Sequence, residues 1–208
     1  MITRILLSAT FLIAPLVFAQ DVAPDELVRR TTTDVVNIIK QDKEIQSGNM
    51  RKVVELAEAK VLPNFDFPRM TQLALGRNWR DASDAQKQAL TKEFRTLLVR
   101  TYSTSLSQYR NQVIDVKPAK LAPADTEVIV KTMVNQPGAP VIPIDYSMEK
   151  SAQGWKAYDI VVDGVSLVTN YRSSFADEIR KGGLDGLIKT IADRNAKGGK
   201  AAPPDKQK

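Results

Sequence analysis

Apolar residues in the first half of the chain recur at the spacing of amphipathic helices. A proline followed by two acids at Pro24 suits a helix start, and the apolar pattern behind it predicts a helix to about Gln46. A second helix is expected from about Met50 to Pro63, because proline stops a helix. A short third helix should end at Gly76. The first part of the protein is therefore expected to be helical.

The longest predicted element begins at a capping box. Ser83 is followed three residues later by Gln86, a pair that satisfies free backbone N–H groups at a helix start. From there a single apolar stripe predicts a helix of about 25 residues, about 38 Å long at about 1.5 Å per residue. The stripe consists of Leu90, Phe94, Leu97, Leu98, Tyr102, Leu106 and Tyr109.

After this helix the apolar period changes from about 3.6 to about 2, which is the period of a strand. Residues 113–116 fit a first strand, and alternating positions predict further strands at 128–134, 142–148 and 155–162. Short turns rich in Pro, Gly and Ser separate the last three strands, which favours an antiparallel meander. Because helices lie mainly before and after the strands, the predicted class is α+β.

A turn at 163–164 leads the last strand into a helix predicted over 166–181, and Gly182-Gly183 separates this helix from another at 184–194. A strand that continues through a glycine turn into an amphipathic helix holds a helical face against the sheet. Any space between the two is apolar, and it is the candidate binding site. Periodicity does not separate a filled core from a lined cavity, so both interpretations remain open.

The first residues, 1–19, are typical of a secretory signal peptide. Arg4 precedes an apolar run with a small-residue end, which predicts cleavage after Ala19. The run is shorter than the roughly 20 apolar residues that span a bilayer. We therefore expect an exported protein with one domain over 20–194. The Gly, Ala, Lys and Pro composition of 195–208 predicts a disordered tail.

The composition narrows the chemistry, because the sequence contains neither histidine nor cysteine. This excludes Cys and His nucleophiles, a serine–histidine couple, an ordinary zinc site and disulfides. The formal net charge of +6 is spread along the chain among interleaved acids. Such a surface is more typical of solubility and mild attraction to anionic membranes than of a nucleic-acid groove.

Some polar residues allow other interpretations. Asp159 and Asp163 could form a carboxylate pair for acid–base work, although strand ends and glycine turns favour Asp for structural reasons. Ser166, Ser173 and Ser174 have no histidine to activate them, and no Ser-x-x-Lys spacing supplies a lysine base. The structural interpretation is the stronger one for all five residues.

Asn170-Tyr171-Arg172 follows the turn closely and could place polar groups at the mouth of a cleft. The alternative is a core Tyr171 with an exposed Arg172 beside it. The sequence leaves these two readings equally open.

The stretch 163–172, together with Phe175 and 183–188, resembles the end of the MlaC or toluene-tolerance family. These proteins are periplasmic phospholipid carriers of the maintenance-of-lipid-asymmetry pathway. Residues 62–67 and 75–79 agree with the same family, as do the aromatic and leucine positions of the long helix. The similarity covers nearly all of the chain after the leader, whereas the tail from Lys197 lies outside it.

This resemblance implies a monomeric α+β shuttle with a sheet of nuclear-transport-factor-2-like (NTF2-like) or cystatin-like shape and helices packed across it. A hydrophobic pocket between them would hold the acyl chains of a diacyl phospholipid, with the headgroup near solvent. The implied partners are an outer-membrane lipoprotein–porin complex and an inner-membrane ABC transporter with a lipid-binding ring. The family uses no metal and no cofactor beyond the lipid cargo, is not enzymatic, and is usually described as moving lipid in the retrograde direction.

We expect the pocket to be lined from three sides, although the inward face of the sheet is not fixed by the pattern. A solute-binding protein for smaller apolar compounds is the alternative function, and an exported hydrolase of unusual mechanism is a third. Headgroup selectivity is not expected, because a headgroup in solvent makes few discriminating contacts. The predicted lining residues are Phe94, Leu98, Tyr102 and Leu106 on the long helix; Val130, Ile144, Tyr146, Met148, Tyr158 and Ile160 on the sheet; Val165, Val168, Tyr171 and Phe175 after the turn; and Phe65, Leu75 and Trp79 at one end.

Overall fold

The computed structural model describes residues 22–197, apart from the side chain of Ser105. The signal peptide predicted at 1–19 lies outside the described residues, as does most of the tail predicted at 195–208. The helices before the sheet are α1 (Pro24–Gln41), α2 (Lys43–Gln46), α3 (Met50–Leu56), α4 (Phe67–Leu75), α5 (Asn78–Asp81) and α6 (Asp84–Ser107). The sheet and the last helix are β1 (Val113–Val116), β2 (Glu127–Asn135), β3 (Ile142–Ser151), β4 (Gly154–Val162), β5 (Val165–Ser166) and α7 (Leu167–Ala196).

The helix predicted from Pro24 to about Gln46 is two helices, which corrects the sequence interpretation. Asp42 has an extended backbone, and its carboxylate accepts hydrogen bonds from the N–H groups of Glu44 and Ile45. It therefore ends α1 and caps α2, because a short acidic side chain can satisfy the free N–H groups of a first helical turn. The apolar pattern continues across the break and conceals it.

Other helix ends agree with the sequence signals. The capping box is confirmed, since the Ser83 hydroxyl accepts from the Gln86 N–H and the Gln86 side chain accepts from the Ser83 N–H. Gly76 ends α4 with a φ of 55°. The second predicted helix reaches Pro63 in three steps, because α3 passes into a π-helical turn (Ala57–Val61) and a 3₁₀ turn (Leu62–Asn64).

The five strands form one sheet in the order β1-β2-β3-β4-β5, and all neighbours are antiparallel. The predicted meander and the α+β class are confirmed. The register pairs Val130 with Tyr146 and Tyr146 with Ile160. Residues directly opposite each other in an antiparallel pair share one face of the sheet, so these three side chains point the same way.

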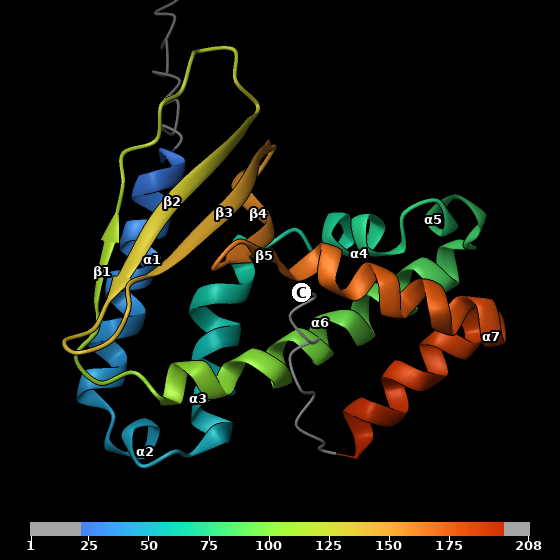
Figure 1. The fold of residues 1–208 in the computed structure, drawn as a ribbon, viewed down its shortest axis with the longest axis horizontal. Coiled ribbons are helices and arrows are strands. Elements are labelled where there is room, and N and C mark those ends of the chain that lie inside the picture. Colours follow the sequence, from blue (N-terminus) through green and yellow to red (C-terminus); the bar gives the residue numbers. More distant parts are fainter. Residues whose placement is uncertain (1–21, 198–208) are drawn as a thin grey trace, which may run out of the picture.

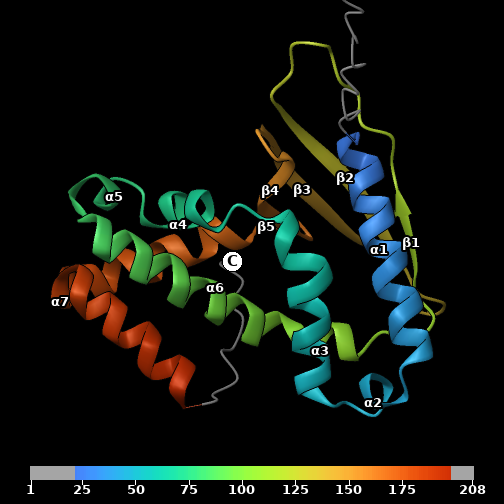
Figure 2. The ribbon, with the colours of Figure 1, turned by 180° about the vertical axis from the view of Figure 1, so that it is seen from behind.

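Helices cover this sheet unequally. α1 lies across the face of β1 and β2 on one side (Figures 1 and 2). α6 and α7 pack on each other, and α4 packs on both of them. In Figure 1 this helical layer lies beside and below the sheet, and α3 runs between α6 and the strands. The sheet thus packs on α1, whereas α6 and α7 pack mainly on each other and on α4.

α7 combines the two helices predicted after the turn. It runs from Leu167 to Ala196 with a kink at Gly183, where φ is 67° and ψ is −170°. The expected break is therefore present as a change of direction within one long element (Figure 1). Near its end, the buried Asn195 side chain donates to the Glu93 carbonyl at 3.0 Å and fixes this end of α7 on α6.

Buried apolar side chains form three separate clusters instead of one core. The helical core joins α4, α6 and α7. The sheet core joins β1–β4 with α1, and the corner core joins α1, α2 and α3. Their fully buried centres are, respectively, Phe94, Met70, Leu90, Leu187 and Ile191; Val130 and Met148; and Ile39, Ile45 and Val53.

One corner of the helical layer is tied to the sheet by Arg69 at the start of α4. Its guanidinium pairs with Glu127 at 2.6 Å and also with Glu149, and it stacks at 3.9 Å on the Tyr158 ring. Glu127 and Glu149 are direct cross-strand neighbours. Facing carboxylates destabilise a strand pair, so Arg69 offsets a repulsion that the sheet would otherwise contain. The hydrogen bond and charge of Arg69 hold the pKa of Glu127 below its ordinary value.

The Gly183 kink gives a first prediction. Gly183→Ala should lower the free energy of unfolding by about 1–2 kcal/mol, because a left-handed backbone is strained once a Cβ is present. Gly186→Ala is the matched control: Gly186 lies in the same helix without a positive φ, and no atom lies within 4 Å of a built Cβ. It should raise stability by up to about 1 kcal/mol. Urea denaturation of both variants checks this, and equal effects would contradict it.

Arg69 gives a second prediction. Arg69→Met should destabilise the fold by about 1–2 kcal/mol at neutral pH, because Glu127 and Glu149 then face each other unneutralised. Because the pKa of Glu127 is lowered in the folded protein, the stability that its ionised carboxylate contributes is fully present above the ordinary carboxyl pKa. This stability is lost as the pH falls through the lowered pKa. The Met variant should therefore lose less stability than the parent between about pH 5 and pH 3.

The control for this prediction is a second change in the same background. Glu149→Gln should recover part of the stability lost in Arg69→Met, because it removes one of the two facing charges. The same change should destabilise the parent protein, in which Glu149 is paired. Urea midpoints of the four proteins form a double-mutant cycle. An additive cycle would mean that Arg69 and Glu149 do not interact, and no recovery of stability by Glu149→Gln in the Arg69→Met protein would mean that the carboxylates do not repel each other.

Candidate functional site

The predicted residues on the helices come together in the helical core. Phe94 meets Tyr171 and Phe175 edge to face, with ring centroids 5.1 Å apart in both pairs. Such edge-to-face pairs stabilise beyond the area they bury. The remaining predicted members are Leu75, Leu98 and Val168, which are buried, and Phe65, Trp79, Tyr102 and Tyr158, which pack on its margin.

Two predicted residues of the sheet lie in the sheet core. Val130 and Met148 are 0% and 1% exposed and pack with Val28 of α1 and with Trp155. They lie on the sheet face that α1 covers, and their side chains are not accessible to solvent. The sequence predicted the correct face of β2 for burial, but α1 covers that face at these two positions.

Other predicted residues lie between the cores and are only partly buried. Ile144, Tyr146 and Ile160 share the face of Val130 and continue it beyond the area of α1. Leu106 approaches from α6 at the margin of the corner core, and Val165 is half-buried in β5. Tyr146 packs on the margin of the sheet core, whereas Ile144, Ile160 and Val165 belong to none of the three cores.

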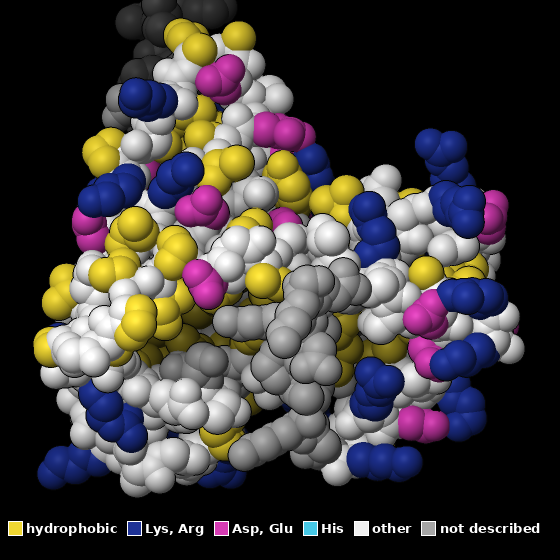
Figure 3. Space-filling model, viewed as in Figure 1, with side chains coloured by type: hydrophobic (Ala, Val, Ile, Leu, Met, Phe, Trp, Pro, Cys, Tyr) yellow, Lys and Arg dark blue, Asp and Glu magenta, His cyan; other side chains and the backbone are white. Residues whose placement is uncertain are grey.

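This combination indicates a recess inside the molecule. Figure 3 shows hydrophobic side chains lying deep between the sheet and the helices beneath it. Burial raises the pKa of the Tyr146 phenol, although its side chain is still partly accessible to solvent. The phenol stays neutral at physiological pH, so this wall of the recess carries no charge.

Tyrosines of the helical core are also held neutral. Burial raises the pKa of the Tyr102 phenol well above its ordinary value, and the neighbouring Tyr171 adds to the effect. Burial likewise raises the pKa of Tyr171, against smaller opposing effects of Thr101 and Arg194. Neutral phenols among leucine, valine and phenylalanine make an environment suited to hydrocarbon, with occasional hydrogen-bonding groups.

Asp159 has a structural role in this arrangement. Its carboxylate accepts from the Ser166 hydroxyl at 2.5 Å, from the Ile160 N–H at 2.8 Å and from the Val168 N–H at 3.1 Å. The Ser166 hydroxyl in turn accepts from the Thr169 N–H and caps α7. Asp163 lies at the turn itself with a φ of 52°. Asp163 thus occupies the turn as expected, whereas Asp159 lies within β4 and holds the turn through hydrogen bonds to residues beyond it.

The same holds for the residues that follow. Tyr171 is 4% exposed in the helical core, whereas Arg172 is exposed on the other side of α7. The Arg172 guanidinium donates to the Leu73 carbonyl at 2.9 and 2.6 Å and attaches α7 to the end of α4. The reading of a core Tyr171 beside an exposed Arg172 is confirmed.

Sequence reasoning missed Arg69 and its surroundings. A hollow of about 510 Å³ adjoins this residue and is lined by Asp66, Pro68, Gln72, Leu73, Trp79 and Glu149 besides Arg69 itself. The predicted lining residue Tyr158 lies under the Arg69 guanidinium and so belongs to the edge of the site. The ion partners are 58 and 80 residues from Arg69 in sequence, so no local pattern could have indicated them.

Within residues 22–197, no group of three or more acidic side chains is placed to hold a metal ion. No helix in this same part of the chain is long and apolar enough to cross a membrane.

The fold has a solved relative. A phospholipid-binding protein from Ralstonia solanacearum, determined in complex with a phospholipid, superimposes with a TM-score of 0.77 and is 40% identical in sequence. The match covers 84% of this chain and 97% of that protein. At this identity the similarity extends beyond the general shape of the fold.

Two named proteins are also similar to this chain in sequence. Toluene tolerance protein ttg2D of Pseudomonas putida is 28% identical over 178 residues, covering 85% of this chain and 82% of that protein. The intermembrane phospholipid transport system binding protein MlaC of Haemophilus influenzae is 25% identical over 132 residues, covering 62% and 61% of the two chains. The MlaC family model matches residues 29–193. Because this match spans most of the sequence, the chain belongs to the MlaC protein family.

Proposed function

We propose that the protein is a phospholipid carrier that holds the acyl chains in the recess between the sheet and the helices. The division of the apolar interior into three cores is the observation that carries this proposal. Ile144 and Ile160 lie outside those cores and Tyr146 lies at the margin of the sheet core, all three as partly accessible side chains on one face of the sheet. The phospholipid in the related Ralstonia solanacearum structure supports the same assignment.

The energetics explain why such a carrier is needed. Exposing two acyl chains with about 30 methylenes to water costs about 25 kcal/mol at about 0.8 kcal/mol each, so spontaneous desorption is very slow. A strand of nine residues such as β2 is about 30 Å long, which exceeds half the hydrocarbon thickness of a bilayer. The sheet and α6 are therefore long enough to cover an acyl chain.

The proposed binding surface consists of those partly accessible members of the predicted set that lie on β3, β4, β5 and α6, apart from Tyr158 under Arg69. Packed members such as Phe94, Val130 and Met148 support this surface from behind. The headgroup would remain near solvent, so headgroup selectivity is not expected. The residues proposed to touch the acyl chains are Tyr102, Leu106, Ile144, Tyr146, Ile160 and Val165.

We place the carrier in the periplasm, after export by the segment 1–19. There it would exchange lipid, as a monomer, between an outer-membrane lipoprotein–porin complex and an inner-membrane ABC transporter with a lipid-binding ring. Family membership supports this route. The carrier needs no catalytic residue or cofactor, because binding and release are the whole of its chemistry.

The prediction uses two faces of the sheet. Tyr146→Glu should reduce co-purified phospholipid by about tenfold or more, because an unpaired carboxylate in an apolar recess is strongly disfavoured. Ile129→Glu is the control: it adds the same charge at an exposed position on the opposite face of the sheet and should keep its lipid. Lipid extraction and native mass spectrometry give lipid per protein, and the urea midpoint reports folding. Full lipid content in Tyr146→Glu would contradict the proposed surface.

A variant on α6 tests the opposite wall of the recess. Leu98→Glu should also lose lipid, but Leu98 is 6% exposed in the helical core, so this variant must first be shown to fold. In the parent protein a diacyl mass supports the phospholipid carrier, whereas a small apolar ligand would favour the solute-binding alternative. Conversion of a labelled phospholipid during long incubation would instead support a hydrolase.

A further inference from the structure

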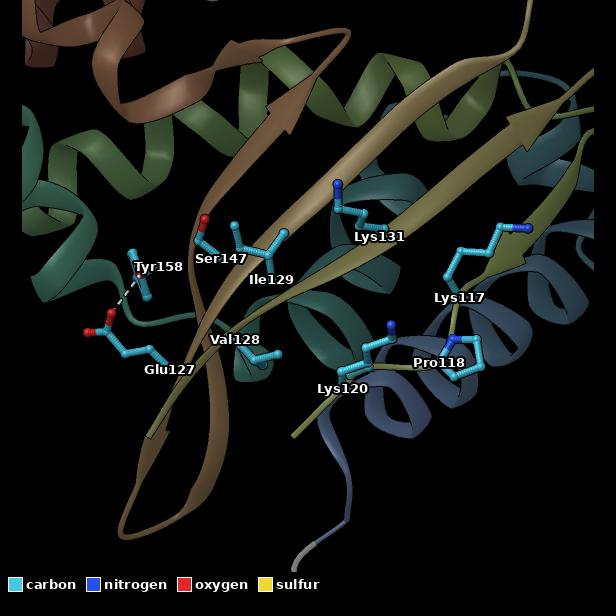
Figure 4. A pocket seen from close by; sticks show the side chains of 10 residues that line it. Lys117, Pro118, Lys120, Glu127, Val128, Ile129, Lys131, Ser147 and Tyr158 are labelled. Atoms are coloured by element: carbon cyan, nitrogen blue, oxygen red, sulfur yellow. Dashed lines mark hydrogen bonds between the residues drawn. The ribbon is translucent and has the colours of Figure 1, made fainter. Parts of the chain in front are cut away.

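A groove lies on the side of the sheet opposite the recess. It has a volume of about 650 Å³ and runs between the segment that follows β1 and the first half of β2. Figure 4 shows Ile129 near its centre, with Lys117 and Lys120 across the opening. Ile129 is 55% exposed. The proposed lipid surface does not use this groove.

The adjacent edge of β2 is open. β1 has four residues and pairs only with Thr132–Asn135, whereas β2 begins at Glu127. One more backbone bond joins the Lys117 N–H to the Lys131 carbonyl at 2.9 Å. Among the described residues, no further backbone bond continues this pairing toward Glu127. A stretch of strand edge is thus left beside the groove.

The alternation of an antiparallel strand shows which groups are available. The Lys131 carbonyl points to the β1 side, so the N–H and C=O groups of Ile129, two residues away, point to that side as well. Those of Glu127 follow the same rule, while the Thr126 carbonyl bonds to Lys150 on the β3 side. Unpaired N–H and C=O groups along a strand edge are a template for another extended chain.

The charge of the groove selects its occupant. Three lysines line it, Lys117, Lys120 and Lys131, against one acid, Glu127, which shares the Arg69 guanidinium with Glu149. Lys117 pairs with Asp115, and Lys131 lies 4.0 Å from Asp145. Lys120 makes no ion pair with any described residue. A second copy of this edge would bring like charges together, and a flat membrane surface cannot reach backbone groups within a groove.

We propose that this edge binds an extended, acidic segment of a partner protein, which adds to the sheet as a strand beside Glu127–Lys131. Backbone bonds to Ile129 and Glu127 give the segment its direction and register. Its alternate side chains meet the lysines on the outer face, and the side chains between them meet Val128 and Ala119. The site lies on the other face of the sheet from the proposed lipid surface, so it does not depend on the identity of the cargo.

The test uses a fluorescent ten-residue peptide that alternates aspartate and valine. Its affinity is measured by anisotropy against the full exported chain, and a peptide alternating lysine and valine serves as control. The acidic peptide should bind at least about tenfold more tightly, and its affinity should fall as salt is raised above about 0.1 M. Equal binding of the two peptides, or no binding of the acidic one, overturns the proposal.

Ile129→Pro tests the backbone contact. A proline fits an edge position whose N–H faces outward, so the fold loses no strand bond, but an added strand loses a donor. Binding should weaken about tenfold, while the co-purified lipid stays at the parent level. Unchanged binding in a folded variant overturns strand addition. The retained lipid separates this outcome from any failure of the carrier function.

Lys120→Glu tests the charge without touching the backbone. It should weaken binding of the acidic peptide about threefold or more. Lys92→Glu, an equal change on the exposed side of α6, should leave the affinity for the peptide unchanged. Equal effects of the two changes overturn the site. Self-association lost in Ile129→Pro would assign the edge to a second copy, and flotation with anionic vesicles lost in Lys120→Glu alone would assign it to a membrane. Either result also overturns the proposal.

Discussion

The carboxylate of Asp159 fixes the direction in which the chain leaves the sheet. It accepts from the adjacent Ile160 N–H and, across the turn, from the Ser166 hydroxyl and the Val168 N–H, at distances from 2.5 to 3.1 Å. α7 therefore starts at a defined angle, and its apolar face meets α6 instead of lying flat on the strands. The aromatic contacts of Phe94, Tyr171 and Phe175 form there. The inward face of β3 and β4 keeps only part of its cover.

An interior arranged in this way has a cost and a use. Side chains beside a space lose dispersion contacts, so three small cores stabilise less than one filled core of the same composition. A bound molecule that fills the space replaces those contacts and stabilises the folded state by mass action. The protein therefore depends on polar ties such as Arg69 and Arg172 to keep its layers in place. Those ties lie outside the three buried clusters.

Local signals in the sequence predicted the elements well, because periodicity, caps and glycines act over a few residues. The Ser83 capping box, the Gly76 helix end and the meander of β2–β4 are all present. The break at Asp42 was missed because a polar cap can interrupt a helix without disturbing its apolar period. The family resemblance is confirmed by the match over residues 29–193.

The candidate site could be predicted only in part, because it depends on packing between distant elements. Aromatic residues of α6 and α7 meet as expected, since both stripes had to face each other. Val130 and Met148 were predicted as lining and are instead covered by α1, whose position on the sheet no local pattern reveals. Whether the partly accessible residues touch a ligand stays a prediction. The Arg69 cluster depends on pairings across more than 50 residues.

The open edge of β2 follows from a mismatch in strand length, four residues against nine, and such edges need protection. Lysines provide it, because they repel a second copy of the same edge and still attract acids. The free stretch is also short. A few backbone bonds, each worth about 0.5–1.5 kcal/mol net, and screened charges give a weak and rapidly formed contact. The proposed carrier leaves one partner to reach another, and such exchange needs an attachment of this strength, because a longer edge would hold the protein in place.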